Sequence, residues 1–158
     1  MRIAKLLSAA FLVVTVSCSS PPKPAASEAA KNVAPPAPED ESTRFPTANL
    51  VKTEVVNKAL MSKPFMPGGT RAHYKKGKRE YEMFVAKLPT PTDAAILLLD
   101  WKKALADAKL IPSFGGYFGK DTGRPVFVFS KGAWIAGVAG LSEKEADLEA
   151  RTLAAHLD

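Results

Sequence analysis

The stretch that decides the fold runs from Val126 to Ala139 and reads VFVFSKGAWIAGVA. Two apolar runs flank a turn at Gly132, a pattern that predicts a β-hairpin. The first run is apolar on both of its faces, as expected for a central strand that is covered on both sides. The second run places Trp134 on one face and Gly137 on the other, where a small-residue surface would let a helix approach closely.

A further hairpin is predicted upstream of this one. Residues 71–74 and 81–86 flank a turn at residues 75–78, whose glycine favours a tight reversal of the chain. Ala72 and Tyr74 alternate with charged neighbours. One face of this hairpin is therefore expected to be buried and the other to be largely solvated.

Helix signals accompany the two hairpins. The clearest predicted helix covers about residues 91–110, with Thr90 as its N-cap and Pro91 at its first position. The last predicted helix begins at Ser142, and Glu145 follows three residues later, which is the pattern of a capping box. Each helix is thus expected to follow one of the hairpins.

Two segments are less clearly marked. Residues 49–61 show a helical apolar stripe, although their β-branched side chains keep a strand open as the alternative. The Gly-rich residues 114–123 are interpreted as a flexible connection between strands, because they do not match the Walker A pattern of a phosphate-binding loop. The predicted order is helix, hairpin, helix, hairpin, helix.

This order predicts a single α+β domain over residues 45–158, with an antiparallel sheet of two β-hairpins and helices packed on it. Each hairpin is followed by a helix, which is compatible with a ββα duplication. The stretch from Gly115-Gly116-Tyr117 to Val138-Ala139-Gly140, together with the closing helix, resembles domains of unknown function in bacterial envelope lipoproteins. That resemblance implies no activity and no site residues.

The N-terminal segment indicates where the protein resides. Arg2 and Lys5 precede an apolar run, residues 6–16, which is shorter than the roughly 20 residues of a membrane-spanning helix and matches a secretory signal peptide. The run ends in Val14-Thr15-Val16-Ser17-Cys18, which resembles the lipobox of bacterial lipoproteins. The resemblance implies that residues 1–17 are removed and that Cys18 becomes the lipid-bearing N-terminus, with palmitate-type acyl chains.

Two alternatives remain open for this segment. One is ordinary signal cleavage after Ser20, which Pro21 disfavours, and the other is an uncleaved signal anchor, for which the apolar run is short. Ser19 resembles the outer-membrane sorting pattern of Gram-negative lipoproteins. It implies a lipid-anchored protein of the bacterial cell envelope, on the outer membrane and facing the periplasm.

A disordered tether is predicted between the anchor and the domain. Residues 18–44 are rich in Pro, Ala, Ser and Glu and show no periodic apolar face. Such a segment cannot bury enough apolar surface to fold, and its proline clusters favour an extended polyproline II conformation. The tether is therefore expected to hold the domain away from the lipid surface.

The sequence contains no recognisable catalytic or metal-binding pattern. Cys18 is the single cysteine, so no disulfide can form within the chain. His73 and His156 are interpreted as surface residues, because two distant histidines without cysteine do not make a zinc site. Glu80 and Glu82 share one face of a strand, which fits a solvated surface better than the carboxylate pair of a glycosidase. We expect no metal, no cofactor and no enzyme activity, and interpret Trp101 and Trp134 as core residues.

The basic turn of the first hairpin is the best candidate for a binding surface. The full chain has a formal net charge of +6, and positive side chains crowd this turn. An anionic envelope component or an acidic protein would suit it, whereas nucleic acid is not expected for an exported chain. Lysines at the edge of a sheet also prevent aggregation, which is the alternative explanation. The candidate residues are Arg71, Lys75, Lys76, Lys78 and Arg79.

The predicted function is that of a membrane-anchored, non-enzymatic binding or accessory module. Two other classes remain open. The chain could be an enzyme whose site is not recognisable from its sequence, or a structural subunit of an envelope complex. A deep pocket with converging ionisable groups would favour the enzyme.

Overall fold

The computed structural model describes residues 37–158, which form a seven-stranded antiparallel sheet with two α-helices. The expected α+β architecture, an antiparallel sheet with helices packed on it, is confirmed. Two short 3-10 turns, η1 and η2, lie in loops. The elements are η1 (Ser42–Arg44), β1 (Leu50–Lys58), η2 (Leu60–Ser62), β2 (Pro67–Lys76), β3 (Arg79–Lys87), α1 (Pro91–Ala104), β4 (Ala106–Ile111), β5 (Gly116–Asp121), β6 (Arg124–Lys131), β7 (Trp134–Ala139) and α2 (Glu143–Ala154).

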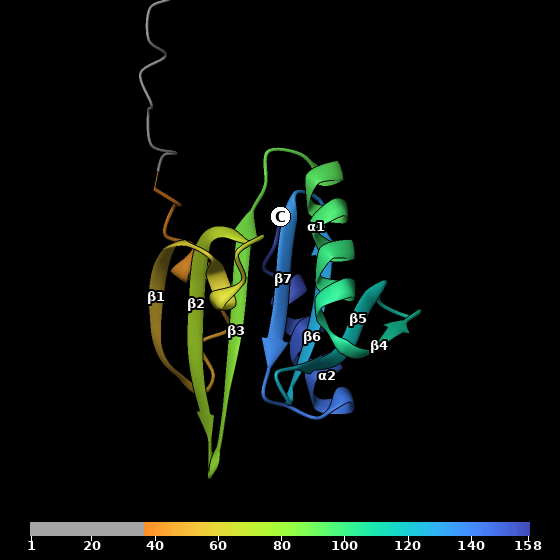
Figure 1. Ribbon diagram of the computed structural model, residues 1–158. Coiled ribbons are helices and arrows are strands. Elements are labelled where there is room, and N and C mark those ends of the chain that lie inside the picture. The colour runs from red at the N-terminus through yellow and green to blue at the C-terminus, as the bar shows by residue number, and fades with distance from the viewer. Residues whose placement is uncertain (1–36) are drawn as a thin grey trace, which may run out of the picture. The chain divides into compact units, whose positions relative to one another are not determined.

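The two predicted hairpins meet at the centre of the sheet. The strand order is β1-β2-β3-β7-β6-β5-β4, so the β2-β3 hairpin joins the β6-β7 hairpin where β3 pairs with β7 (Figure 1). Phe84 of β3 lies opposite Gly137 of β7 at this junction. A Cβ atom on Gly137 would lie 2.5 Å from Cζ of Phe84, so the missing side chain makes room for the aromatic ring.

The helices α1 and α2 cover opposite faces of the sheet (Figure 1). Trp101 of α1 is fully buried and stacks on Phe84, with 5.5 Å between the ring centroids. On the other face, Leu153 of α2 belongs to the same core cluster as Phe127 and Phe129 of β6. Every residue of β7 is buried as a result. The β6-β7 hairpin is therefore covered on both faces, as its sequence predicted.

The two hairpin-and-helix units, β2-β3-α1 and β6-β7-α2, are not equivalent in space. A two-fold axis normal to the sheet would relate the antiparallel neighbours β3 and β7, and it would leave both helices on one face. Instead the helices lie on opposite faces, and both pack against β6 and β7. The order of the elements is therefore compatible with a ββα duplication, as the sequence suggested, but the two units are not arranged symmetrically.

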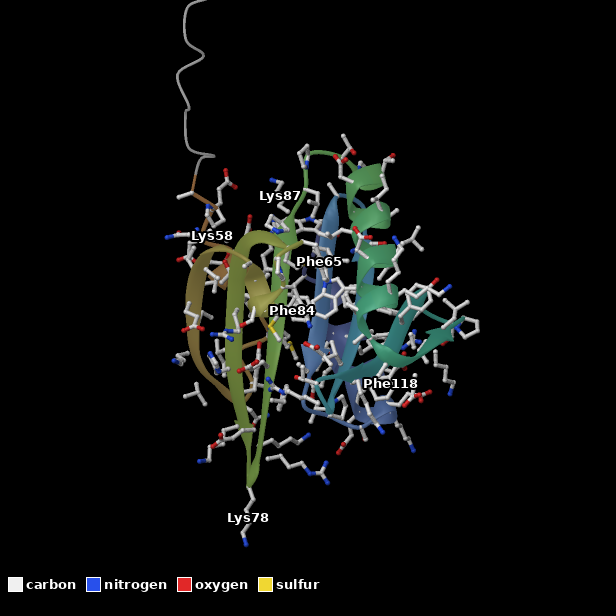
Figure 2. The ribbon with its side chains drawn as sticks, viewed as in Figure 1. Lys58, Phe65, Lys78, Phe84, Lys87 and Phe118 are labelled. Atoms are coloured by element: carbon white, nitrogen blue, oxygen red, sulfur yellow. The ribbon has the colours of Figure 1, made fainter. Side chains whose placement is uncertain are left out.

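A loop takes the place of a helix over one face of β2 and β3. The connection between β1 and β2 buries Leu60 and Met66 on the α1 face. Nε1 of Trp101 donates a hydrogen bond to Sδ of Met66 at 3.1 Å, and Phe65 packs edge-on against the same indole with 5.6 Å between the ring centroids. Figure 2 shows Phe65 and Phe84 close to α1. This loop closes the core at the end of β2 away from the hairpin turn.

The opposite face of β1 and β2 is covered by the segment that precedes β1. Phe45 is buried in the same cluster as the α2 side chains. The backbone N–H of Glu41 donates to Oγ1 of Thr70 at 3.0 Å, and Oγ of Ser42 donates to Oγ1 of Thr53 at 2.9 Å. Residues 41–44, which the sequence places at the end of the tether, therefore make specific contacts with the folded domain.

Residues 49–61 form strand β1 and turn η2, so the predicted helix is wrong here and the alternative strand is correct. β1 pairs with β2 in an antiparallel register that places Val55 opposite Thr70. The β-branched residues prefer this extended backbone, and pairing with β1 satisfies backbone groups along an edge of β2 that would otherwise be unpaired. A left-handed residue, Ala59 at φ 54°, then turns the chain into η2.

The helix predicted over residues 91–110 ends early, at Ala104. The flexible connection predicted over residues 114–123 instead contains strand β5. Leu105 already has extended backbone angles, and residues 106–111 form β4. β4 pairs with β5, which comes from the Gly-rich stretch. A Cβ atom on Gly119 would lie 2.8 Å from the carbonyl oxygen of Ala106, so this glycine lets the two strands approach. The sheet gains two strands that the sequence did not predict.

Both helices begin where the sequence predicted. Oγ1 of Thr90 accepts a hydrogen bond from the backbone N–H of Asp93 at 3.1 Å, which caps α1. Oγ of Ser142 donates to Oε2 of Glu145 at 2.6 Å at the start of α2. Neither described helix has the length and apolar character needed to cross a membrane.

Candidate functional site

The β2-β3 hairpin extends beyond the ends of the neighbouring strands (Figure 1). Its register pairs Tyr74 with Tyr81 and Lys76 with Arg79. Gly77 turns the chain with φ 63°, and no atom lies within 4 Å of where its Cβ would be. Lys78 therefore lies at a solvated tip, as Figure 2 shows.

A tyrosine pair anchors this projecting hairpin to the core. The rings of Tyr74 and Tyr81 stack with 4.9 Å between their centroids and an interplanar angle of 12°. Both side chains are buried, and the hydroxyl of Tyr74 donates to the carbonyl oxygen of Pro46 at 2.8 Å. Burial raises the pKa of Tyr81 to about 12, and the nearby carboxylate of Glu149 acts in the same direction. The tip thus projects from a packed, neutral base.

The five basic residues predicted as one cluster lie on two faces of the hairpin and at its tip. Arg71 and Lys75 are four residues apart on β2 and share the α1 face, because side chains alternate along a strand. Lys76 and Arg79 form a cross-strand pair on the α2 face. Lys78 lies in the turn between them. The structure therefore does not gather all five side chains at one point.

Three of these five basic residues also form ion pairs with carboxylates. Arg71 pairs with Glu54, and its Nε donates to Oε1 of that carboxylate at 2.6 Å. Lys75 pairs across the hairpin with Glu80 at 3.2 Å, and Arg79 pairs with Glu145 of α2. Within residues 37–158, Lys76 and Lys78 form no ion pair. These two side chains therefore carry the uncompensated positive charge of the tip.

A second polar feature crosses the α1 face of the sheet and is called here the ionic row: Glu54, His73, Glu82 and Arg124. Nε2 of His73 lies 3.3 Å from Oε1 of Glu54, and its Nδ1 lies 3.3 Å from Oε1 of Glu82. Nη1 of Arg124 donates to Oε2 of Glu82 at 2.8 Å. The residues come from β1, β2, β3 and β6. The row connects both halves of the sheet where neither helix covers it.

The ionic row shows what the sequence could and could not indicate. Alternation along β2 predicted a solvated face with His73 on it. Glu54 was missed because its segment was expected to be helical, and Arg124 because its contact depends on how β6 lies relative to β3.

Hydrogen bonds from Arg71 and His73 lower the pKa of Glu54 to about 2. The row is thus an ion-pair network. Glu82 pairs with Arg124 within it, and Glu80 pairs with Lys75 outside it.

The remaining candidates take the positions expected for structural residues. Trp101 and Trp134 are buried, so their interpretation as core residues is confirmed. His156 is exposed near the end of α2, and its carbonyl oxygen accepts a hydrogen bond from Nη1 of Arg44 at 3.2 Å. In the described part of the chain, no group of three or more His, Cys, Asp or Glu side chains is placed to hold a metal ion. Cys18, the predicted lipid attachment point, lies outside the described residues.

Comparison with known proteins found no matching family model, no similar curated protein and no similar solved structure. The functional argument therefore depends on the residues of this chain.

Proposed function

We propose that this chain is a lipid-anchored protein of the bacterial cell envelope whose domain is a non-enzymatic binding module for an anionic envelope component. The anchor in this proposal is Cys18, at the end of an apolar run with a basic start. Two or more acyl chains hold a protein stably on a membrane, whereas one chain gives only marginal binding. Removal of residues 1–17 and location on the periplasmic face of the outer membrane are parts of the same proposal.

The observation that carries the binding role is the projecting β2-β3 hairpin with Lys76 and Lys78 at its end. Both side chains are exposed, and within the described chain neither forms an ion pair. A basic residue close to an anionic lipid surface contributes about 1 kcal/mol of attraction. Two such residues would give weak binding that a membrane anchor strengthens by keeping the domain close to its partner.

The test uses residues 19–158, the proposed mature chain without its acylated cysteine, so that neither the lipid anchor nor the apolar run at residues 6–16 masks binding by the domain. We expect this protein to cosediment with vesicles of an anionic phospholipid or with isolated peptidoglycan, and not with vesicles of phosphatidylcholine. The double variant Lys76→Glu and Lys78→Glu should lose about tenfold or more in binding at low salt. The matched control is Lys120→Glu with Lys144→Glu, which makes the same charge change at exposed positions on β5 and α2.

The outcomes separate clearly. Loss of binding in the hairpin variant alone supports the proposal. Equal loss in both double variants would show that net charge, and not the hairpin, attracts the partner. No binding of the parent protein to either preparation would refute the anionic partner. For the anchor, mass spectrometry of the membrane-extracted wild type should find acyl chains on Cys18, and an unmodified N-terminus would contradict it.

A further inference from the structure

The described chain begins at one end of the domain, and the β2-β3 turn lies at the other (Figure 1). The backbone N–H of Glu41 donates to Oγ1 of Thr70 in the first half of β2. Ala37 borders a hollow that also contains Lys87, the last residue of β3. Gly77 turns the chain at the far end of the same two strands. Since β2 has 10 residues, about 30 Å separates its two ends.

The end of the hairpin beyond the tyrosine pair is polar throughout. Residues 75–80 read KKGKRE, and every one of them is exposed. None carries an apolar side chain, so this tip has nothing to insert among acyl chains and nothing to form the apolar centre of a protein interface. A stable protein interface also buries about 800 Å² on each partner, which requires a broader surface than a two-stranded tip. The tip therefore offers charge alone.

A small apolar hollow behind the tip is bordered by carboxylates. Leu141 and Leu148 line it beside Lys76, and Glu145 and Glu149 belong to the same lining. Its volume of about 60 Å³ is far below that of a ligand site. The carboxylates repel an anionic headgroup that approaches this hollow. An anionic partner of the tip is therefore expected to bind at its end and not against α2.

The binding available at the end of the tip is weak for a single anion. Lys76 and Lys78 form no ion pair within the described chain, and each contributes about 1 kcal/mol next to an anionic surface. A partner that repeats the same anion many times binds more firmly without a larger contact, because a released lysine meets a neighbouring anion at high local concentration. These properties favour a polyanion.

We propose that the tip binds an anionic cell-wall polymer with repeated carboxylates, and not the membrane that carries Cys18. This inference rests on the proposed function and names its partner. The chain that leads from Cys18 enters the domain at the end opposite to the tip. It would have to run back along the domain for the tip to reach that lipid surface. Lys76 and Lys78 instead point toward a layer on the other side of the domain.

The test couples residues 18–158 to vesicles through Cys18, the single cysteine of the chain, with a maleimide lipid. Fluorescent phosphatidylcholine vesicles carrying the protein are mixed with isolated peptidoglycan and centrifuged at a speed that leaves free vesicles in solution. We expect the peptidoglycan to bring the vesicles into the pellet. Lys76→Glu with Lys78→Glu should reduce the pelleted fluorescence by about tenfold or more. The matched control, Lys120→Glu with Lys144→Glu, should pellet like the parent.

Lysine acetylation by a water-soluble reagent, followed by mass spectrometry, locates the contact. Peptidoglycan should slow the acetylation of Lys76 and Lys78 in the coupled protein. Anionic phosphatidylglycerol in the coupled vesicles, without peptidoglycan, should not. Lys120 and Lys144 are internal controls and should react at the same rate in all samples. Slower acetylation of the tip in phosphatidylglycerol vesicles alone would overturn the proposal in favour of the anchoring membrane.

Peptidoglycan fragments test the need for a repeated anion. Digestion with a muramidase yields disaccharide peptides that carry the same carboxylates on separate molecules. At equal carboxylate concentration, these fragments should compete with the intact polymer at least about tenfold more weakly. Equal competition would overturn the polymer as the partner.

Failure of this proposal is distinguishable from failure of the proposed function. If residues 19–158 bind vesicles of an anionic phospholipid but not peptidoglycan, the anionic partner stands and the cell-wall polymer is refuted. If they bind neither preparation, both proposals fail. Peptidoglycan binding that Lys76→Glu with Lys78→Glu leaves unchanged would refute the role of the hairpin in both.

Discussion

The two central hairpins have similar turns and opposite environments. Tyr74-Lys75-Lys76-Gly77 and Phe129-Ser130-Lys131-Gly132 each lead into a return strand and then a helix. The β6-β7 hairpin is covered by α2 on one face and α1 on the other, and all of β7 is buried. The β2-β3 hairpin is buried as far as Tyr74 and Tyr81, whereas its end beyond this pair is exposed and charged.

This difference indicates a division of tasks within one sheet. The covered hairpin buries Phe127, Phe129 and Trp134 along its length and is packed on both faces, so it contributes to stability throughout. The projecting hairpin is buried as far as the Tyr74 and Tyr81 stack, but residues 75–80 at its end are exposed, so the charge of this tip can change without cost to the fold. Substitutions in the two hairpins should consequently affect different properties of the protein.

The largest effect is expected in the covered hairpin. Phe127→Ala removes a ring that has no solvent exposure, and it should reduce the free energy of unfolding by about 3–5 kcal/mol. The measurement is urea unfolding followed by tryptophan fluorescence. Lys78→Ala at the tip of the other hairpin is the comparison and should change stability by less than about 0.5 kcal/mol. Similar losses in both variants would contradict the division of tasks.

A smaller effect is expected at alkaline pH, at the base of the projecting hairpin. Since burial raises the pKa of Tyr81 to about 12, the unfolded chain loses this phenolic proton near pH 10 while the folded chain retains it. Stability should therefore fall as the pH rises from 10 to 12, by the order of 1–2 kcal/mol for this residue.

The variant Tyr81→Phe isolates this contribution. Its stability, measured by urea unfolding at several pH values, should decline less steeply than that of the wild type over the same interval. Burial also raises the pKa of Tyr74, so this residue contributes a loss of stability at alkaline pH to both proteins. Parallel curves for the two proteins would show that the Tyr81 hydroxyl is not protected in the folded state.

The smallest effect is expected in the ionic row. The lowered pKa of Glu54 means that its ionised form stabilises the folded chain above the ordinary pKa of 4.5, and that this contribution disappears as the pH falls toward 2. Because the pair with Arg71 is partly exposed, Glu54→Gln should cost only about 0.5–1 kcal/mol at pH 7. The difference from the wild type should vanish near pH 2.

A matched control for the ionic row is Glu80→Gln, which breaks the exposed pair with Lys75. It should change stability by no more than a few tenths of a kcal/mol at pH 7. A loss as large as that of Glu54→Gln would show that the contacts of Glu54 with Arg71 and His73 stabilise the fold no more than an exposed ion pair does.

Sequence reasoning was most successful where one face of a segment is sharply apolar. The β6-β7 hairpin, the start of α1 at Thr90 and the start of α2 at Ser142 all follow from local patterns. It failed for β1, β4 and β5, whose strand character depends on a neighbouring edge being available for pairing. At the candidate site, it found the basic hairpin but predicted one cluster, because it did not follow which face each side chain takes or which carboxylate neutralises it.

The sequence by itself determined the α+β class, the two central hairpins and the positive charge of the projecting turn, because alternation, capping and turn residues act over a few neighbouring positions. It also contains the proposed lipid attachment site at Cys18, because such a motif is defined by consecutive residues and does not depend on the fold. Only the tertiary structure decided that Lys76 and Lys78 lack partners within the described chain and that Glu54, His73, Glu82 and Arg124 meet in one row. These arrangements join residues far apart in the sequence, and pairwise electrostatics depends on distance in space rather than on separation along the chain.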